Sequence, residues 1–379
     1  MILRYRITVI SVLITVIPAS FAADSRHPSA AELNNQGVRA AQDGQFATGV
    51  DYLRRAVTAD PNDPLLRTNL SGVLTEWAGR LEHTGEVDQA ERLLQEALQH
   101  EPANGRAFAL LGDIAYFRRS DFAKAVDYWK RAYATLPAEE QRMAADRIAQ
   151  AQRDQTIEHG FASKRTAHFE IRLARQQGID LEALERLLEE AYARLMNGLG
   201  SGPSTITVIV YSRQDLRRTY NQRDWALGFY DGRLRLAWNE VASALAPSLI
   251  AHELTHAFLR HAYAGGLPIW VHEGLAQVEE GARPMAEQER RWEEGVRSGS
   301  SWVPVKWLDR RFTHPSNTED VARAYVEARL IVARLIERHG MGQFTAFLKQ
   351  LSDGAAIEAT YDAAFAPDRW ARTDAPIFE

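Results

Sequence analysis

Two histidines and a glutamate near the middle of the chain have the types and spacing that could do chemistry. His252, Glu253 and His256 form the pattern H-E-x-x-H within the segment 251–261, AHELTHAFLRH. On a helix, the i, i+4 spacing places both imidazoles on one face, about one turn apart. Two neutral imidazole nitrogens at that separation can bind one zinc ion, and Glu253 would lie beside a water molecule at the metal. The pattern therefore predicts part of a zinc hydrolase site.

The next helical segment offers the third ligand that such a site needs. The segment 268–276, PIWVHEGLA, begins on proline, as helices often do, and carries Glu273 in its first turns. Gly265 and Gly266 allow the chain to reverse, so the second helix can pack beside the first. Two histidines and one glutamate leave the fourth position of a tetrahedral zinc ion open for water, as a catalytic site requires. We therefore predict that His252, His256 and Glu273 bind zinc.

Other ionisable side chains close to these residues are expected to have lesser roles. His272 directly precedes Glu273, but about 100° of helical rotation separates them, so only one of the two can point at the metal. We prefer Glu273, with His272 as a residue that could support the ligands from outside. Glu279 and Glu280 are expected in solvent. Two later carboxylates could orient a ligating histidine, and the sequence does not select between them: Glu319 and Asp320.

The C-terminal half contains the elements that must position this site. Residues 167–174 and 204–211 alternate between apolar and polar side chains and predict strands. Asp231 and Gly232 predict the turn of a hairpin. Helices are predicted at 180–197, with Asp180 as N-cap and Gly198 as stop, at 212–220, at 244–262 and at 268–280. Strands that precede the helices of the site indicate an α+β domain, which we place at 165–379.

The N-terminal half carries a helical pattern that repeats about every 34 to 40 residues. In each copy the second helix has a small, a large and a small residue before a proline: Gly49, Leu53, Ala56 and Pro61; Ala90, Leu94, Ala97 and Pro102; Ala125, Trp129, Ala132 and Pro137. This spacing predicts two closely packed helices per copy. The second copy has about six extra residues in its first helix or turn, and the third has one. A single copy cannot bury its own apolar face, so stacking and a polar capping helix over 138–159 are expected.

Both halves resemble known families. The repeats resemble tetratricopeptide repeats, which implies an all-α solenoid over 30–160 whose groove binds a partner protein or a substrate segment. A spacer or dimerisation arm is the alternative. The pattern W-x-x-E-G-x-A at 270–276, after HELTH, resembles the gluzincins and most closely the bacterial peptidase MA-like families, which are often fused to such repeats. This resemblance implies a peptidase domain with Glu273 as the third zinc ligand.

The resemblance continues into the C-terminal part of the chain. Residues 303–308, 324–328 and 335–340 look like the end of the same domain, where a helix bearing a tyrosine runs beneath the cleft and ends at His-Gly or Tyr-Gly. It implies that Tyr325 hydrogen-bonds the tetrahedral intermediate. A tyrosine on an apolar helix is also typical of a core residue, and that alternative stays open.

The first segment of the chain predicts export. Arg4 and Arg6 precede an apolar run at 7–17, and small residues at 20 and 22 fit a cleavage site after Ala22. The run is shorter than the roughly 20 residues needed to span a bilayer, which disfavours the alternative of an uncleaved anchor. We expect a signal peptide over 1–22 and a periplasmic or secreted protein without stable membrane insertion.

Composition narrows the class of protein further. A chain of 379 residues is long enough for two or three domains. A net charge of −5 gives no basic surface for nucleic acid. The absence of cysteine excludes disulfides, thiolate ligands and thiol catalysis. The sequence therefore predicts an exported zinc peptidase that acts on protein or peptide, with Glu253 as general base. The alternatives are a cell-envelope scaffold or adaptor with a vestigial or structural zinc site, and hydrolysis of a non-peptide bond.

Overall fold

A computed structural model describes residues 28–174, 180–220, 228–237, 244–263, 266–281, 286–298 and 305–365 of the chain. These residues form two compact units that separate between His159 and Gly160. The predicted signal segment, Gly265 and residues 303–304 lie outside the described residues. Within the described ranges, no helix combines the length and the apolar character needed to cross a membrane.

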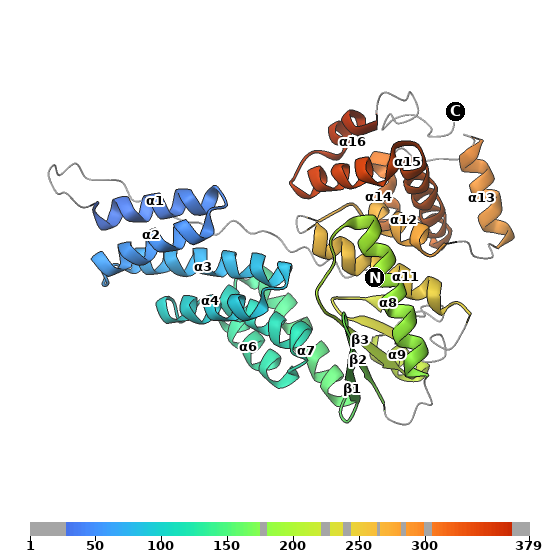
Figure 1. Cartoon of the computed structure of the whole chain (residues 1–379). Helices are drawn as coiled ribbons and strands as arrows, with labels where there is room; N and C mark the ends of the chain where they lie inside the picture. Colours follow the sequence, from blue (N-terminus) through green and yellow to red (C-terminus); the bar gives the residue numbers. More distant parts are fainter. Residues whose placement is uncertain are drawn as a thin grey trace. The chain divides into compact units, whose positions relative to one another are not determined.

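The N-terminal unit consists of helices that follow one another as antiparallel pairs (Figure 1). They are α1 (Ala30–Gln42), α2 (Phe46–Ala59), α3 (Pro64–Thr84), α4 (Val87–His100), α5 (Gly105–Asp113), the π-helical turn η1 (Ile114–Arg118), α6 (Phe122–Thr135) and α7 (Ala138–Ile157). One apolar cluster runs through the first five of them and includes Val38, Leu53, Leu74, Leu94 and Leu111. Each pair therefore buries its apolar face against the next pair.

Small residues let the two helices of a pair approach closely, as the sequence predicts. A Cβ atom on Gly49 would lie 2.8 Å from the carbonyl oxygen of Gly37, so only glycine fits there. The extra residues of the second copy lengthen α3, which has 21 residues against 13 in α1. The one extra residue of the third copy coincides with η1, since a π-helical turn accommodates an additional residue within a helix.

The C-terminal unit contains a mixed sheet of five strands. They are β1 (Ala162–Arg165), β2 (Phe169–Leu173), β3 (Ile206–Tyr211), β4 (Gly228–Tyr230) and β5 (Leu234–Ala237), in the order β1-β2-β3-β5-β4. The strands β2, β3 and β5 are parallel, whereas β1 and β4 are antiparallel edge strands of this described sheet. The predicted strands and the hairpin are confirmed. The strand β1 was not predicted, because its residues ASKR lack an apolar face and it is held by backbone pairing to β2.

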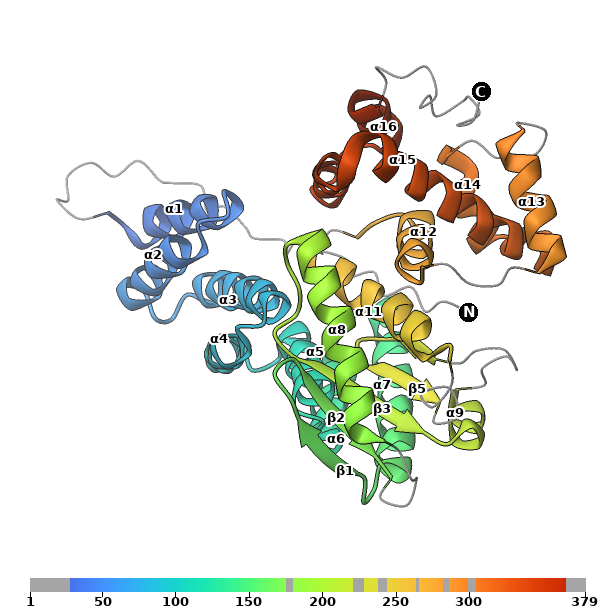
Figure 2. The same ribbon diagram turned by 45° about the vertical axis from the view of Figure 1, so that its right-hand side comes forward.

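Two long helices cover one face of this sheet (Figure 2). They are α8 (Leu181–Leu199) and α11 (Ala246–Ala262), and α9 (Arg213–Tyr220) follows β3. Leu188 of α8 and Phe258 of α11 pack in one apolar cluster with Val208 of β3. Asp180 caps α8 as predicted, because its side chain accepts a hydrogen bond from the backbone N–H of Ala183. The predicted stop at Gly198 is wrong: the helix continues to Leu199 and ends at Gly200, whose φ of 72° is left-handed.

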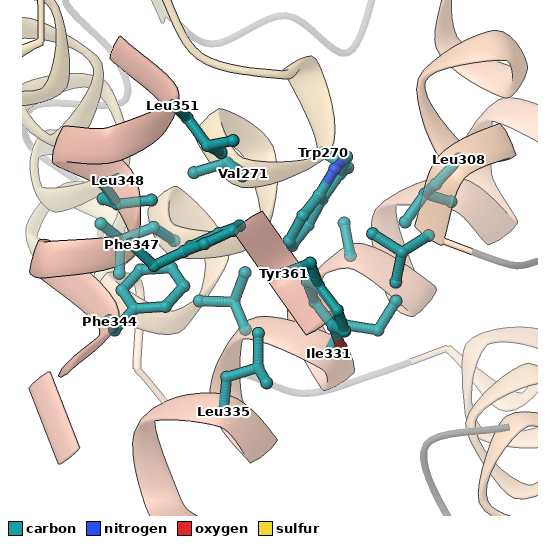
Figure 3. Packing of buried hydrophobic residues seen from close by; sticks show 14 of the residues in the cluster. Trp270, Val271, Leu308, Ile331, Leu335, Phe344, Phe347, Leu348, Leu351 and Tyr361 are labelled. Atoms are coloured by element: carbon teal, nitrogen blue, oxygen red, sulfur yellow. The ribbon is translucent and has the colours of Figure 1, made fainter. Parts of the chain in front are cut away.

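The remaining helices pack around α12 and α15, and α12 joins them to α11. They are α12 (Ile269–Glu279), α13 (Glu287–Arg297), α14 (Val305–Thr313), α15 (Thr318–Ser352) and α16 (Ile357–Phe365). Trp270 and Val271 of α12 are buried among Leu308, Ile331 and Phe347 (Figure 3). As the His-Gly pattern predicts, Gly340 interrupts α15, with φ of 80°. The described chain is thus an all-helical region followed by an α+β region.

Candidate metal centre

The helix α11 holds His252 and His256 on its partly exposed side. Its opposite side is buried, since Ile250, Leu254 and Phe258 belong to the apolar cluster on the sheet. This burial fixes the rotation of the helix about its axis. The two imidazoles therefore point away from the sheet, with ring centroids 5.0 Å apart. The sequence prediction that both lie on one helical face is confirmed.

The helix α12 brings Glu273 to these two histidines. Its Oε2 atom lies 3.7 Å from Nε2 of His252 and 3.8 Å from Nε2 of His256. One donor atom from each of the three side chains lies within 4.8 Å of the other two, so the group could hold a metal ion. Metal–ligand bonds of about 2.1 Å at tetrahedral angles place donor atoms roughly 3.4 Å apart. The two separations from Glu273 are close to that value.

A glycine next to Glu273 makes this arrangement sterically feasible. A Cβ atom on Gly274 would lie 2.5 Å from the carbonyl oxygen of Ala328 on α15 and 2.7 Å from Cγ2 of Val332. Any larger residue would push α12 away from α15. The Glu-Gly pair therefore combines a ligand with the close helix contact that brings α15 to the same site.

Glu253 is buried directly beside the histidines, with only 7% of its surface exposed. Burial raises the pKa of the Glu253 carboxyl, while the charge of His252 and a hydrogen bond from the backbone N–H of Tyr230 oppose that rise. Since Tyr230 lies on β4, the edge strand holds the orientation of this carboxylate. The position of Glu253 beside a water at the metal stays a prediction.

Glu280, just after α12, lies against His252, which contradicts one of the sequence predictions. It was expected in solvent, but its Oε1 atom lies 2.5 Å from Nδ1 of His252. The hydroxyl of Ser248 donates a hydrogen bond to the backbone carbonyl of Glu280 and holds it against α11. Glu279, also expected in solvent, is paired with Arg194 of α8 at 3.3 Å. These contacts fix the carboxylate that orients the first histidine.

The two carboxylates that the sequence offered for this role lie elsewhere. Glu319 is exposed in the first turn of α15. Asp320 accepts a hydrogen bond from the backbone N–H of Ser316 and so stabilises the start of that helix. A signal for Glu280 was nevertheless present: it follows Glu273 by seven residues, which is two helical turns on the same side.

His272 lies next to the group without joining it. Its ring centroid is 5.8 Å from that of His256, and its ring nitrogens are not part of the three-donor group. Burial, and then the charge of Arg260, lower the pKa of His272 to about 4. The ring is therefore neutral at physiological pH. This placement agrees with Glu273 rather than His272 as the donor from α12.

Tyr325 of α15 lies within electrostatic reach of the carboxylates of the site. Burial and then the negative charges of Glu273, Glu253 and Glu280 raise the pKa of this phenol. The ring packs edge-on against Phe312, with centroids 5.2 Å apart. The phenol therefore stays protonated and can donate a hydrogen bond within the site.

Comparisons with known proteins do not assign this chain to a family. None of the protein-family models matches the chain, and no curated protein is found to be similar to it.

Metal affinity is expected to rise with pH. Burial opposes the charge on His252, but the hydrogen bond to Glu280 and the neighbouring carboxylates outweigh it and raise the pKa of His252 to about 9. Burial also raises the pKa of Glu273 to about 7. Because a metal displaces these protons, the affinity should increase about tenfold per pH unit between pH 7 and 9, more steeply below pH 7, and level off above pH 9. Competition titrations with a metal indicator at several pH values measure this slope.

Replacing Glu280 with glutamine is expected to weaken metal binding by about 10- to 100-fold. The amide can still meet Nδ1 of His252 but carries no charge to increase the basicity of the ring. The matched control is Glu190→Gln on α8, which removes the same charge from an exposed position. Equal affinities for the Glu280→Gln protein and the control would show that Glu280 has no influence on the metal.

Proposed function

We propose that this chain is an exported zinc-dependent peptidase of the gluzincin type. The observation that carries the proposal is the meeting of three donor side chains beside the buried carboxylate of Glu253. Two further facts support it. The donors lie on two helices in the sequence pattern that resembles the peptidase MA-like families, and the first residues resemble a signal peptide for export to the periplasm.

The donor set favours zinc over harder divalent cations. Two imidazoles and one carboxylate are typical zinc ligands, whereas magnesium and calcium prefer oxygen donors alone. Three protein ligands are also the number found in catalytic rather than structural zinc sites. When bound, zinc supplies the Lewis acidity that polarises a carbonyl oxygen and makes water more acidic.

The protein's own residues provide the proton transfers of peptide hydrolysis. The Glu253 carboxylate accepts a proton from water as the water oxygen attacks the carbonyl carbon. The same carboxyl group then delivers that proton to the amine nitrogen as the C–N bond breaks, which leaves a carboxylate and an amine. Tyr325 donates a hydrogen bond to the former carbonyl oxygen while it carries negative charge.

A peptide is the substrate class that the edge of the sheet favours. The strand β4 pairs with β5 on one side and lies at the edge of the described sheet. Its residue Tyr230 hydrogen-bonds Glu253, so this edge lies next to the general base. An extended peptide can pair with the backbone of an edge strand, which would bring its carbonyl groups past the site.

The helical repeats are proposed to recruit the substrate or a partner protein. This assignment depends on the resemblance to tetratricopeptide repeats and on the closely packed helix pairs of the N-terminal unit. A spacer or dimerisation arm is the other role that such an array can have.

Metal analysis combined with peptide digestion tests the proposed function. The purified mature protein is expected to contain one zinc ion and to cleave members of a broad peptide library. A chelator should abolish the cleavage, and added zinc should restore it. Stoichiometric zinc with no chelator-sensitive cleavage would contradict the peptidase assignment and favour the scaffold with a structural zinc site.

A further inference from the structure

One face of α11 carries a row of chemically active side chains that extends beyond the metal ligands. Between Ile250 and Arg260, only His252, His256 and Arg260 are partly exposed, and every other residue is buried. The three share the four-residue spacing that keeps side chains on one helical face. Arg260 therefore follows His256 by one turn, about 6 Å farther along the axis.

The surroundings of Arg260 place it beside the edge strand. Its Cζ atom lies 5.7 Å from the centroid of the Tyr230 ring. Tyr230 is the residue whose backbone N–H orients Glu253. Arg260 and the general base thus contact the same residue of β4.

The charges along this face are separated by sign. Carboxylates gather around His252: Glu280 contacts its ring, and Oε2 of Glu273 lies 3.7 Å from its Nε2. Arg260 places a positive charge at the other end, past His256. A substrate that follows this face therefore meets a cation on one side of the reacting bond and carboxylates on the other.

We propose that Arg260 binds a carboxylate of the peptide substrate, located one or two residues from the bond that is cleaved. This inference depends on the proposed peptidase function. The spacing supports it, since about 6 Å corresponds to one or two residues of an extended chain at roughly 3.4 Å per residue. A guanidinium also binds a carboxylate through two parallel hydrogen bonds. The carboxylate can come from a free C-terminus or from an Asp or Glu side chain.

A purely structural role for Arg260 leads to different expectations. A cation in the last turn of a helix stabilises the helix dipole, and α11 ends at Ala262. Lysine satisfies that role as well as arginine does, because it carries the same charge. Lysine cannot reproduce the two parallel hydrogen bonds to a carboxylate. The Arg260→Lys variant therefore separates recognition from stabilisation of the helix.

The kinetic test uses the zinc-loaded full mature chain and a peptide library made twice, as free C-terminal acids and as C-terminal amides. A third set of amides carries Glu or Gln at each position near the cleaved bond. The wild-type protein should cleave carboxylate-bearing peptides with about 10- to 100-fold higher kcat/KM than their neutral counterparts, mainly through KM. The Arg260→Gln variant should lose this preference, and Arg260→Lys should recover it only in part. The control Arg186→Gln removes an exposed arginine of α8 and should keep it.

A binding measurement separates this inference from the proposed function. Fluorescence anisotropy compares labelled acid and amide peptides on the zinc-loaded Glu253→Gln protein, with and without the Arg260→Gln change. If the acid peptides bind more tightly than the amides, and the Arg260→Gln change removes that difference, the inference is supported even if no peptide is cleaved. The missing cleavage then contradicts only the peptidase assignment. If cleavage is chelator-sensitive but kcat/KM is equal for acids and amides, and equal for peptides carrying Glu and Gln, the inference is overturned. The peptidase assignment then stays intact. A preference for the free acids alone identifies the C-terminus as the source of the carboxylate. A preference for Glu over Gln in the amides identifies a side chain.

Discussion

Replacing Glu253 with glutamine is expected to lower the rate of peptide hydrolysis by about 10²- to 10⁴-fold while zinc stays bound. The amide has nearly the same shape and can still occupy the buried position beside β4, but it cannot accept a proton from water. Glu253 is not one of the three donor side chains, so its replacement removes no ligand. Single-turnover rates and zinc content, measured on the same preparation, give both quantities.

The Tyr325→Phe variant is the informative comparison. Phenylalanine keeps the edge-on packing against Phe312 and removes only the hydroxyl. If the phenol stabilises the charged oxygen, kcat should fall by roughly 10²- to 10³-fold, as when an oxyanion donor is lost, with little change in KM. A Glu253→Gln protein that cleaves as fast as wild type would refute the mechanism, and an unaffected Tyr325→Phe protein would assign that residue to the core alone.

The parts of the site that the sequence predicted are those set by local spacing. His252 and His256 are separated by one helical turn, so any helix at this position puts them together. Glu273 lies on the next helix, so local spacing alone did not place it; the pattern W-x-x-E-G-x-A and its resemblance to the peptidase MA-like families singled it out. The capping of α8 by Asp180 is local in the same sense, since the contact spans three residues.

The parts that the sequence did not predict depend on contacts between distant elements. Glu280 was placed in solvent because a carboxylate at a helix end is usually solvated, yet the packing of α12 on α11 brings it to His252. That packing depends on apolar contacts of Trp270 and Val271 with α14 and α15, which no pattern within α12 reveals. The end of α8 was misplaced by two residues because Gly198 and Gly200 are both suitable stops, and backbone conformation decides between them.

Replacing Glu273 with glutamine is expected to have opposite effects on the zinc-loaded and the zinc-free protein. The neutral amide is a poor zinc ligand, so the affinity should fall by more than the roughly 10- to 100-fold typical of a residue outside the ligand shell. The zinc-free protein should become more stable. Burial raises the pKa of Glu273 from its ordinary value to about 7, so the charged form is disfavoured in the folded state. This cost is absent below the unfolded pKa of 4.5, grows as pH rises, and is complete above about pH 7.

Thermal unfolding with and without zinc, above about pH 8, measures both effects on the same samples. For the wild-type protein, zinc should raise Tm strongly, because it binds the folded state and neutralises the buried carboxylate. For Glu273→Gln, the zinc-free Tm should exceed that of wild type. The corresponding gain in the free energy of unfolding is on the order of 1–3 kcal/mol. The increase on adding zinc should be nearly lost. At about pH 4 the zinc-free proteins should unfold together, since both side chains are then neutral. A zinc-dependent rise in Tm equal to that of wild type would exclude Glu273 as a ligand.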